Sequence, residues 1–441
     1  MLKAGKQIWE TRPLEIWARA KELRAKWQRS ISDSAVSERS FLAHGNTGDA
    51  EWPIGFEGLN VVEDNPAGAM MASVSDAFSR KARLASEIRG WGRELCGYVN
   101  NCWGAQFLGR ETDGKPFAYR DMCIPFPDPC DQHTKRGQQC MDLSPIPRWG
   151  ADNGMYLGEW DPPRDRALLE HRIQCILRII NDIERVFGIR FDDEKFLENL
   201  DARAKLEDYG LEIARLMTRR PAPISQKDLY SFYTLGTLTK GDPRELLDFW
   251  KDFVDEVKWR ADNSIAAVGN ECYRYMEHHP SPWHFLKYFR YMEQYGAVCV
   301  GSQYSHLMAG RMELKEDGSL GRRFKPPAPA GKPKTREDGL RRIFTESRSW
   351  VYKDEEYFRK SALTDFAKAF QVDGAIMPLW RCGVGCTINR KEQGLRLSAM
   401  GVRVLHYEGS QPGDRTDMDE SRFLDALDVW MESQGLEKSA E

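Results

Sequence analysis

Residues 372–409 read VDGAIMPLWRCGVGCTINRKEQGLRLSAMGVRVLHYEG. An apolar run at 375–379 is followed by two cysteines, then by a helix-compatible stretch and by a second apolar run that ends at Tyr407. This order predicts a strand, a helix and a second strand that lies parallel to the first. Because ligands bind beyond the carboxyl ends of parallel strands, Cys382 and Cys386 lie at a candidate binding edge.

The composition of the 441-residue chain is that of a globular protein of two or three domains. Its net charge of −3 gives no reason to expect binding to nucleic acid or to an anionic membrane. The sequence has no apolar run of membrane-spanning length and no secretory leader pattern, which predicts a cytoplasmic location. In that compartment the ten cysteines are expected to be thiols or metal ligands. Fourteen tryptophans suggest large buried faces or contacts with other subunits.

The rest of the chain predicts an α/β protein with a large helical part. Residues 1–50 are expected to form an N-terminal helical arm, with a helix at 11–31, and then a loop at 32–52. Residues 51–163 are expected to form a first α/β domain, with an apolar segment, a turn at 63–68 and a long helix.

Two further segments complete the predicted domain organisation. Residues 164–270 show helical periodicity and predict a helical domain. Residues 271–441 predict a second α/β domain, which includes a strand at 297–301 and the unit at 372–409.

Three cysteine positions could meet in one site: Cys96, Cys130, and either Cys382 or Cys386. Each follows an apolar segment at an expected helix start, where the helix dipole favours a thiolate. Cys102 lies six residues after Cys96 and about 120° away around a helix, so only one of this pair is expected to be a ligand. Three thiolates without a fourth suit an iron–sulfur cluster with one open iron better than zinc. Buried structural thiols are the alternative interpretation.

Seven motifs resemble, in order, the 2-hydroxyacyl-CoA dehydratase and benzoyl-CoA reductase family. They are GLNVVEDNPAG, ELCGYVNNCWG, PDPCDQHTK, RRPAPISQKDL, YMEQYGAVCVGSQY, DGAIMPLWRC and GVRVLHYEGSQPGDR. They extend over residues 50–435. Within the family, the chain is most similar to the larger cluster-bearing subunit of ATP-dependent benzoyl-CoA reductase.

This resemblance implies two flavodoxin-like parallel-sheet domains and a helical domain. It also implies a [4Fe-4S] cluster on three cysteines, a paralogous cluster-bearing subunit, an iron–sulfur ATPase activator and a CoA-thioester substrate. Carried over by motif, the ligands fall on Cys96, Cys130 and Cys382. Cys386 stays an alternative because the third match needs a one-residue gap. Trp380 is bulkier and less polar than the amide-bearing residues that family members often carry near this site, so the resemblance does not identify the acyl group.

Several other residues are weaker candidates. His133, His279, His284 and His306 lie near expected strand ends or turns, where they could move protons or serve as hydrogen-bonded structural residues. Asp414 and Glu408 follow the last strand and are expected to cap a helix rather than face a cleft. No GxxxxGK[ST] loop is present, so ATP is expected to bind only to a partner subunit.

The sequence therefore predicts an iron–sulfur subunit of an oxygen-sensitive, ATP-coupled reductase that passes low-potential electrons to an aromatic acyl-CoA of the benzoyl-CoA type. A 2-hydroxyacyl-CoA dehydratase subunit is one alternative. A non-catalytic electron-relay or scaffold subunit of the same complex is the other.

Overall fold

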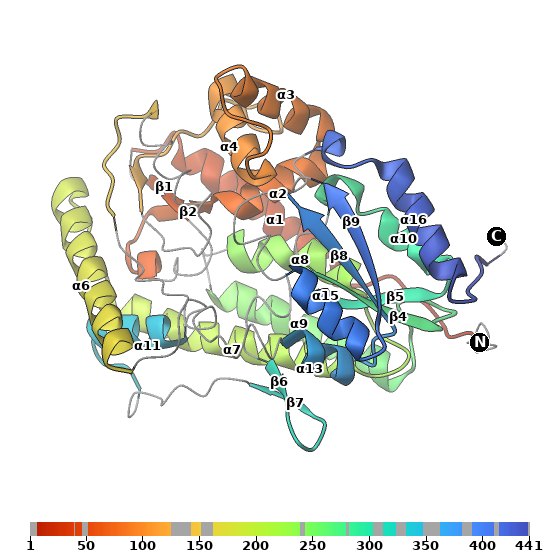
Figure 1. Ribbon diagram of the computed structural model, residues 1–441. Helices are drawn as coiled ribbons and strands as arrows, with labels where there is room; N and C mark the ends of the chain where they lie inside the picture. Colours follow the sequence, from red (N-terminus) through yellow and green to blue (C-terminus); the bar gives the residue numbers. More distant parts are fainter. Residues whose placement is uncertain are drawn as a thin grey trace.

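The computed structural model describes residues 7–38, 40–45, 52–124, 143–150, 162–238, 243–278, 282–302, 312–322, 332–346, 362–381, 390–409 and 414–439. In these ranges the chain forms helices around a three-stranded and a four-stranded parallel sheet, with a short antiparallel hairpin (Figure 1). The predicted α/β class with parallel sheets is confirmed.

The first sheet contains β1 (Phe41–Gly45), β2 (Leu59–Glu63) and β3 (Met122–Cys123) in the order β2-β1-β3. The predicted loop at 32–52 is therefore wrong for residues 41–45, which form the central strand. Leu42 and Ala43 are fully buried and belong to different hydrophobic clusters, so β1 is covered on both faces. Two-sided burial outweighs the polar composition around this short strand.

The N-terminal helix starts later than its sequence predicts. Thr11 forms a β-bridge with Ala266, and α1 runs over Trp17–Ser34. The Glu256 carboxylate accepts hydrogen bonds from the backbone N–H groups of Glu15 and Ile16, at 2.8 and 3.0 Å. A distant carboxylate thus binds N–H groups next to the helix start.

The predicted turn at 63–68 and the long helix after it are also wrong. Helix α2 (Asp64–Val74) follows β2 directly, and α3 covers Asp76–Glu87. Ser75 separates the two helices, and its hydroxyl accepts a hydrogen bond of 3.2 Å from the Phe78 N–H. Serine is a strong helix-capping residue, which explains the break.

The second sheet has the order β5-β4-β8-β9 and consists of β4 (Tyr273–Glu277), β5 (Ala297–Ser302), β8 (Gly374–Trp380) and β9 (Arg403–Gly409). Helix α15 (Arg390–Ala399) lies between β8 and β9 in the sequence, and these strands are parallel neighbours. The unit predicted from residues 372–409 is confirmed. Numbered along the chain, the sheets read 2-1-3 and 2-1-3-4, the flavodoxin-like order.

Both faces of the second sheet are buried. Met276, Val298 and Met377 belong to a large aliphatic cluster, whereas Tyr275 and Cys299 belong to an aromatic one. Side chains alternate between the faces of a strand, so neighbouring residues of β4 and β5 enter different cores.

The helical part consists of α6 (Pro162–Phe187), α7 (Asp193–Met217), α8 (Gln226–Leu238) and α9 (Pro243–Asp262). Ile173, Ile176, Ile180 and Ile183 are buried in one cluster, as their spacing predicts. Helix α8 lies between the two sheets and contacts both β5 and β2 (Figure 1).

The remaining elements are η1 (Trp52–Gly55), α4 (Gly97–Leu108), η2 (Trp283–Phe285), α10 (Tyr288–Glu293), β6 (Met312–Leu314), β7 (Leu320–Arg322), α11 (Arg336–Glu346), α13 (Ala362–Ala369), η4 (Arg415–Asp417) and α16 (Glu420–Glu432). None of the helices in the described ranges combines the length and the hydropathy of a membrane span. The division into four segments stays a prediction. The place of β1 means that a first α/β domain has to include residues 41–45.

Candidate functional site

Of the residues that the sequence singles out, the structure describes Cys96 and, among the weaker candidates, His284, Glu408 and Asp414. Cys96 is buried, 3% exposed, and is the residue that precedes the first turn of α4. His284 lies in η2. The other predicted residues lie outside the described ranges: Cys130, His133, His279, His306, Cys382 and Cys386.

Cys96 and Cys102 enter different cores. Cys96 belongs to the aromatic cluster that also contains Tyr98, Trp283 and Trp380. Cys102 belongs to an apolar cluster beneath the first sheet. Cys96 precedes the helix and Cys102 lies within it, and the two thiols contact different clusters. That only one of the pair is a ligand stays a prediction.

Close helix packing fixes the position of α4. A Cβ atom added at Gly104 would overlap the Ala82 carbonyl of α3, and one added at Gly68 of α2 would lie 2.6 Å from the Tyr98 carbonyl oxygen. The Asn101 amide donates a hydrogen bond of 3.3 Å to the Gly68 carbonyl. Two glycines in the sequence motifs thus allow α2 and α3 to pack tightly against the helix that starts after Cys96.

The turn between α3 and Cys96 is held by hydrogen bonds from both helices. The Asn100 amide donates to the Gly92 carbonyl at 3.1 Å, and the Arg83 guanidinium donates to the Arg93 carbonyl at 3.2 Å. The Ser86 hydroxyl donates to the Asn100 carbonyl at 3.0 Å. The backbone before Cys96 is therefore ordered by buried polar groups.

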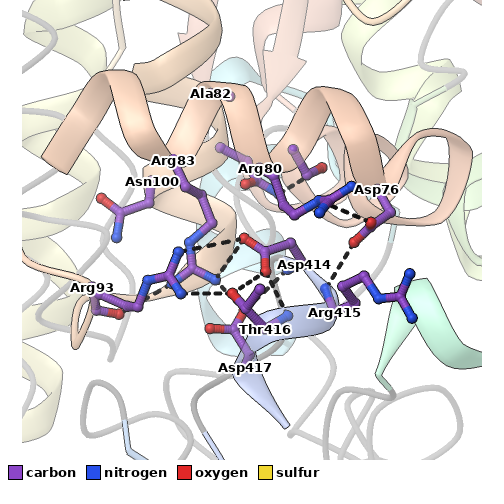
Figure 2. A network of polar contacts seen from close by, with 12 residues as sticks. Asp76, Arg80, Ala82, Arg83, Arg93, Asn100, Asp414, Arg415, Thr416 and Asp417 are labelled. Carbon is purple, nitrogen blue, oxygen red and sulfur yellow. Dashed lines mark hydrogen bonds and ion pairs between the residues drawn. The ribbon is translucent and has the colours of Figure 1, made fainter. Parts of the chain in front are cut away.

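A buried ion-pair network joins this turn to the segment after β9. Arg83 forms an ion pair with Asp417 and lies 3.5 Å from the Asp414 carboxylate, and all three side chains are fully buried. Arg93 donates a hydrogen bond of 2.6 Å to the Thr416 hydroxyl. Figure 2 shows Arg83 and Arg93 converging on residues 414–417.

The network balances two buried carboxylates with two guanidinium groups. Arg93 is the second cation, 3.9 Å from Asp414. Burial lowers the pKa of Arg93, but hydrogen bonding to Glu87 and the charges of Glu87, Asp414 and Asp417 outweigh this and raise its pKa above the usual value. Arg93 therefore remains charged beside the buried acids.

The capping role expected for Asp414 is confirmed. Its carboxylate accepts a hydrogen bond of 2.7 Å from the Thr416 N–H, and its own N–H donates to Asp417 at 3.0 Å. This reciprocal pair starts η4. Glu408, by contrast, is 74% exposed and lies 3.9 Å from Arg381.

The start of α4 also contacts the segment after β4. The Trp283 indole donates a hydrogen bond to the Tyr98 hydroxyl. At the end of β8, Trp380 packs edge-on against Tyr407 at 5.1 Å. These contacts and the arginine network place Cys96 near the carboxyl edge where β4, β8 and β9 end.

Arg381 is the last described residue before the two predicted ligands of this region. Its N–H donates a hydrogen bond of 2.9 Å to the Gly409 carbonyl at the end of β9. Strand β8 lies next to the first strand of its sheet, at the point where the strand order reverses. Ligands of flavodoxin-like sheets bind at this switch point.

Two buried polar residues at this edge escaped the sequence reasoning. Glu277 ends β4 and accepts hydrogen bonds from the hydroxyls of Tyr230 and Tyr288, at 2.9 and 2.7 Å. His278 follows it and lies 2.5 Å from the Gln393 amide oxygen. The available signal was the strand sequence YRYME, in which a carboxylate ends an otherwise buried aromatic strand.

His284 has a fully buried side chain, and neither ring nitrogen has a hydrogen-bond partner within the described part of the chain. Its Nε2 atom lies 3.7 Å from Glu420. Burial lowers the pKa of His284, and the charge of Glu420 offsets part of this effect. The imidazole is therefore neutral near pH 7.

The described ranges contain no group of three His, Cys, Asp or Glu side chains that could hold a metal ion. They contain one of the three predicted cluster cysteines. Cys96 suits a thiolate ligand because it precedes the first turn of a twelve-residue helix, where the dipole favours a negative charge.

Comparisons with known proteins point to one family. The sequence model of the family described as "2-hydroxyglutaryl-CoA dehydratase, D-component" matches residues 67–425. The chain is also 21% identical over 226 residues to a protein of Clostridium sporogenes described as "(R)-phenyllactyl-CoA dehydratase alpha subunit". That alignment covers 50% of this chain and 53% of the relative, about half of each protein.

Proposed function

The chain belongs to the 2-hydroxyglutaryl-CoA dehydratase D-component family, and from this premise we propose that it is the cluster-bearing subunit of an ATP-coupled enzyme that acts on an aromatic acyl-CoA. The family makes the chain a component of the 2-hydroxyacyl-CoA dehydratase type. The first candidate reaction is reduction of the aromatic ring of a benzoyl-CoA type substrate, which the order of the sequence motifs favours.

One structural observation carries the proposal. The turn that precedes Cys96 is joined by buried ion pairs to residues that follow β9, and the start of α4 is joined through Tyr98 to a residue that follows β4. Cys96 thus lies near the carboxyl edge of the second sheet. Strand β8 of this sheet ends at Trp380, and Cys382 follows two residues later in the sequence. We propose Cys96, Cys130 and Cys382 as the ligands of a [4Fe-4S] cluster, with Cys386 as the alternative third ligand.

When bound, the cluster would supply single electrons of low potential to the thioester. The chain's own contribution is to hold the Cys96 backbone rigid and to surround it with aromatic side chains. Arg83 and Asn100 fix the turn before Cys96, whereas Trp283 and Trp380 are 5% and 2% exposed in the same cluster. Such walls exclude water from a reactive intermediate.

A second candidate reaction is dehydration of a 2-hydroxyacyl-CoA. The name of the family and the name of the Clostridium relative, a phenyllactyl-CoA dehydratase subunit, favour it. The two reactions differ in their net consumption of electrons. The reduction consumes electrons, whereas the dehydration releases water without net reduction. Both would use an acyl-CoA that carries an aromatic group.

We also propose that the enzyme needs partner subunits. The relative is an alpha subunit, which suits a hetero-oligomer with a paralogous cluster-bearing subunit. An iron–sulfur ATPase activator would bind and hydrolyse ATP, because this sequence carries no phosphate-binding GxxxxGK[ST] loop.

Anaerobic co-purification with the neighbouring gene products would test this proposal. Iron and sulfide would be measured in the purified complex, and the complex would be assayed with benzoyl-CoA and with (R)-phenyllactyl-CoA. ATP-dependent consumption of benzoyl-CoA with oxidation of the electron donor supports the reductase. Loss of water from phenyllactyl-CoA without donor oxidation supports the dehydratase. A chain without iron, or one that hydrolyses ATP alone, overturns the proposal.

A further inference from the structure

We infer that Glu277, Tyr230 and Ser302 form a proton relay along the carboxyl edge of the second sheet, from Ser302 at the end of β5 to the buried Glu277 carboxylate at the end of β4. The link to an acyl-CoA reaction rests on the function proposed above. The movement of protons along the three side chains is a property of this chain alone.

The three groups form a continuous chain of hydrogen bonds. Glu277 and Ser302 are the last residues of β4 and β5 and lie opposite each other in the sheet. Tyr230 of α8 lies between their side chains, with its hydroxyl 2.9 Å from the Glu277 carboxylate and 2.8 Å from the Ser302 hydroxyl. A phenol carries one proton, so Tyr230 donates to one neighbour while it accepts from the other.

Proton movement follows from this arrangement. When the Ser302 hydroxyl accepts a proton at the sheet edge, it passes its own proton to the Tyr230 oxygen. Tyr230 then passes its proton to the Glu277 carboxylate, which becomes a neutral acid. The reverse sequence returns the proton, and no electron moves in either direction. Removal of a substrate proton and delivery of a proton to a reduced ring can therefore use the same path.

Tyr288 provides an internal comparison. Its hydroxyl donates a hydrogen bond of 2.7 Å to the other carboxylate oxygen of Glu277. Its ring is fully buried, stacked on Phe289 at 4.2 Å and packed against Phe423 at 5.4 Å. Tyr288 therefore contributes a similar hydrogen bond without being part of the path to Ser302.

The surroundings of Glu277 keep the neighbouring phenols protonated. Burial raises the pKa of Tyr275, Tyr288 and Tyr407 well above the usual value, and the charge of Glu277 raises each further. Burial and Glu277 likewise raise the pKa of the Cys299 thiol. The hydroxyls of Tyr275 and Tyr407 have no hydrogen-bond partner within the described ranges, so polar atoms beside the relay can still accept or donate.

A purely structural network predicts a different response to mutation from a relay. Tyr230→Phe and Tyr288→Phe each remove one phenol that hydrogen-bonds Glu277, so a structural role predicts similar effects. A relay predicts that Tyr230→Phe and Ser302→Ala interrupt proton movement, whereas Tyr288→Phe does not.

The test follows protonation of Glu277 by infrared spectroscopy after a rapid pH change, in the full-length chain and without substrate. The Glu277 carboxylate band is assigned with Glu277→Gln. We expect Tyr230→Phe and Ser302→Ala to slow its protonation by about tenfold or more, and Tyr288→Phe to leave it within about twofold. Equal rates in the three variants overturn the relay.

A second measurement connects the relay to turnover. In the assembled enzyme, Tyr230→Phe and Ser302→Ala should lower kcat about tenfold or more and change the solvent isotope effect, with KM and iron content unchanged. Tyr288→Phe should leave kcat and the isotope effect close to wild type. If wild type itself lacks iron or turnover, the proposed function fails, and the infrared experiment still decides the relay.

Discussion

Arg83 and Asp417 lie 334 positions apart in the sequence, yet their side chains form an ion pair from which solvent is excluded. The pair connects α3, next to the Cys96 turn, with the segment that follows the last strand of the second sheet. The position of Cys96 relative to that sheet thus depends on residues that are far apart in the sequence.

Arg83→Gln should lower the free energy of unfolding by about 3–5 kcal/mol, because Asp414 and Asp417 would keep buried charges without their main partner. Urea denaturation of the full-length chain measures this loss. Arg80→Gln is the control, since Arg80 is 48% exposed and its ion pair with Asp76 should contribute less than about 1 kcal/mol. Similar losses in the two variants would contradict a special role for the buried pair.

Cys96→Ser should abolish bound iron after anaerobic purification, whereas Cys102→Ser within α4 should retain it, because the two thiols face different clusters. Cys130→Ser and Cys382→Ala are also expected to lose iron. Retention of iron in Cys382→Ala together with loss in Cys386→Ala would move the third ligand to Cys386.

The sequence allowed the strand, helix and strand of residues 372–409 to be predicted because each segment has its own periodicity. It also pointed to Cys96, since the cysteine stands directly before a helix. Strand β1 was missed because five residues between polar stretches carry no repeat. Pairing with two neighbouring strands and burial on both faces stabilise it.

The contacts of Arg83 and Glu277 could not be predicted for a related reason. Each partner lies in a distant part of the chain, and only the tertiary fold brings Asp417 to α3 or Tyr230 to the end of β4. In the sequence, a buried charged residue can be recognised only as a polar residue within an apolar pattern. The pattern gives no information about which residue will be its partner.

Gly104→Ala should destabilise the chain by about 1–3 kcal/mol or more, because the new methyl group overlaps the Ala82 backbone and α3 and α4 must move apart. Thermal or urea unfolding measures the change. Gly210→Ala in α7 is the matched control, since its Cβ would meet no atom within 4 Å. It should stabilise the helix by about 0.5–1 kcal/mol. If Gly210→Ala also lowers the free energy of unfolding, the loss in Gly104→Ala cannot be attributed to the overlap with Ala82.

His284 should make the folded chain sensitive to acid. Its folded pKa lies below the unfolded value of about 6.5, so below that pH the unfolded chain binds a proton that the folded chain does not. Stability should therefore fall as the pH drops from neutral through about 6.5, and His284→Gln should reduce this fall.

Glu420→Gln should change the acid sensitivity in the opposite direction from His284→Gln. The Glu420 charge raises the pKa of His284, so its removal should lower that pKa further and increase the loss of stability in acid. Stability is measured by urea unfolding at a series of pH values. Parallel curves for wild type and both variants would exclude His284 as the source of the acid sensitivity.

The sequence separation between Arg83 and Asp417 also determines when their ion pair can form during translation. A ribosome that adds about 5–20 residues per second needs roughly 20–70 s to proceed from the first residue of this pair to the second, 334 positions later. Throughout that interval Arg83 has no Asp417 to bind, and the turn before Cys96 is not yet joined to the second sheet. If Cys96 holds a cluster as proposed, the turn before it is joined to the second sheet only after residue 417 has been synthesised, and in a chain truncated before residue 417 this turn should lack that connection.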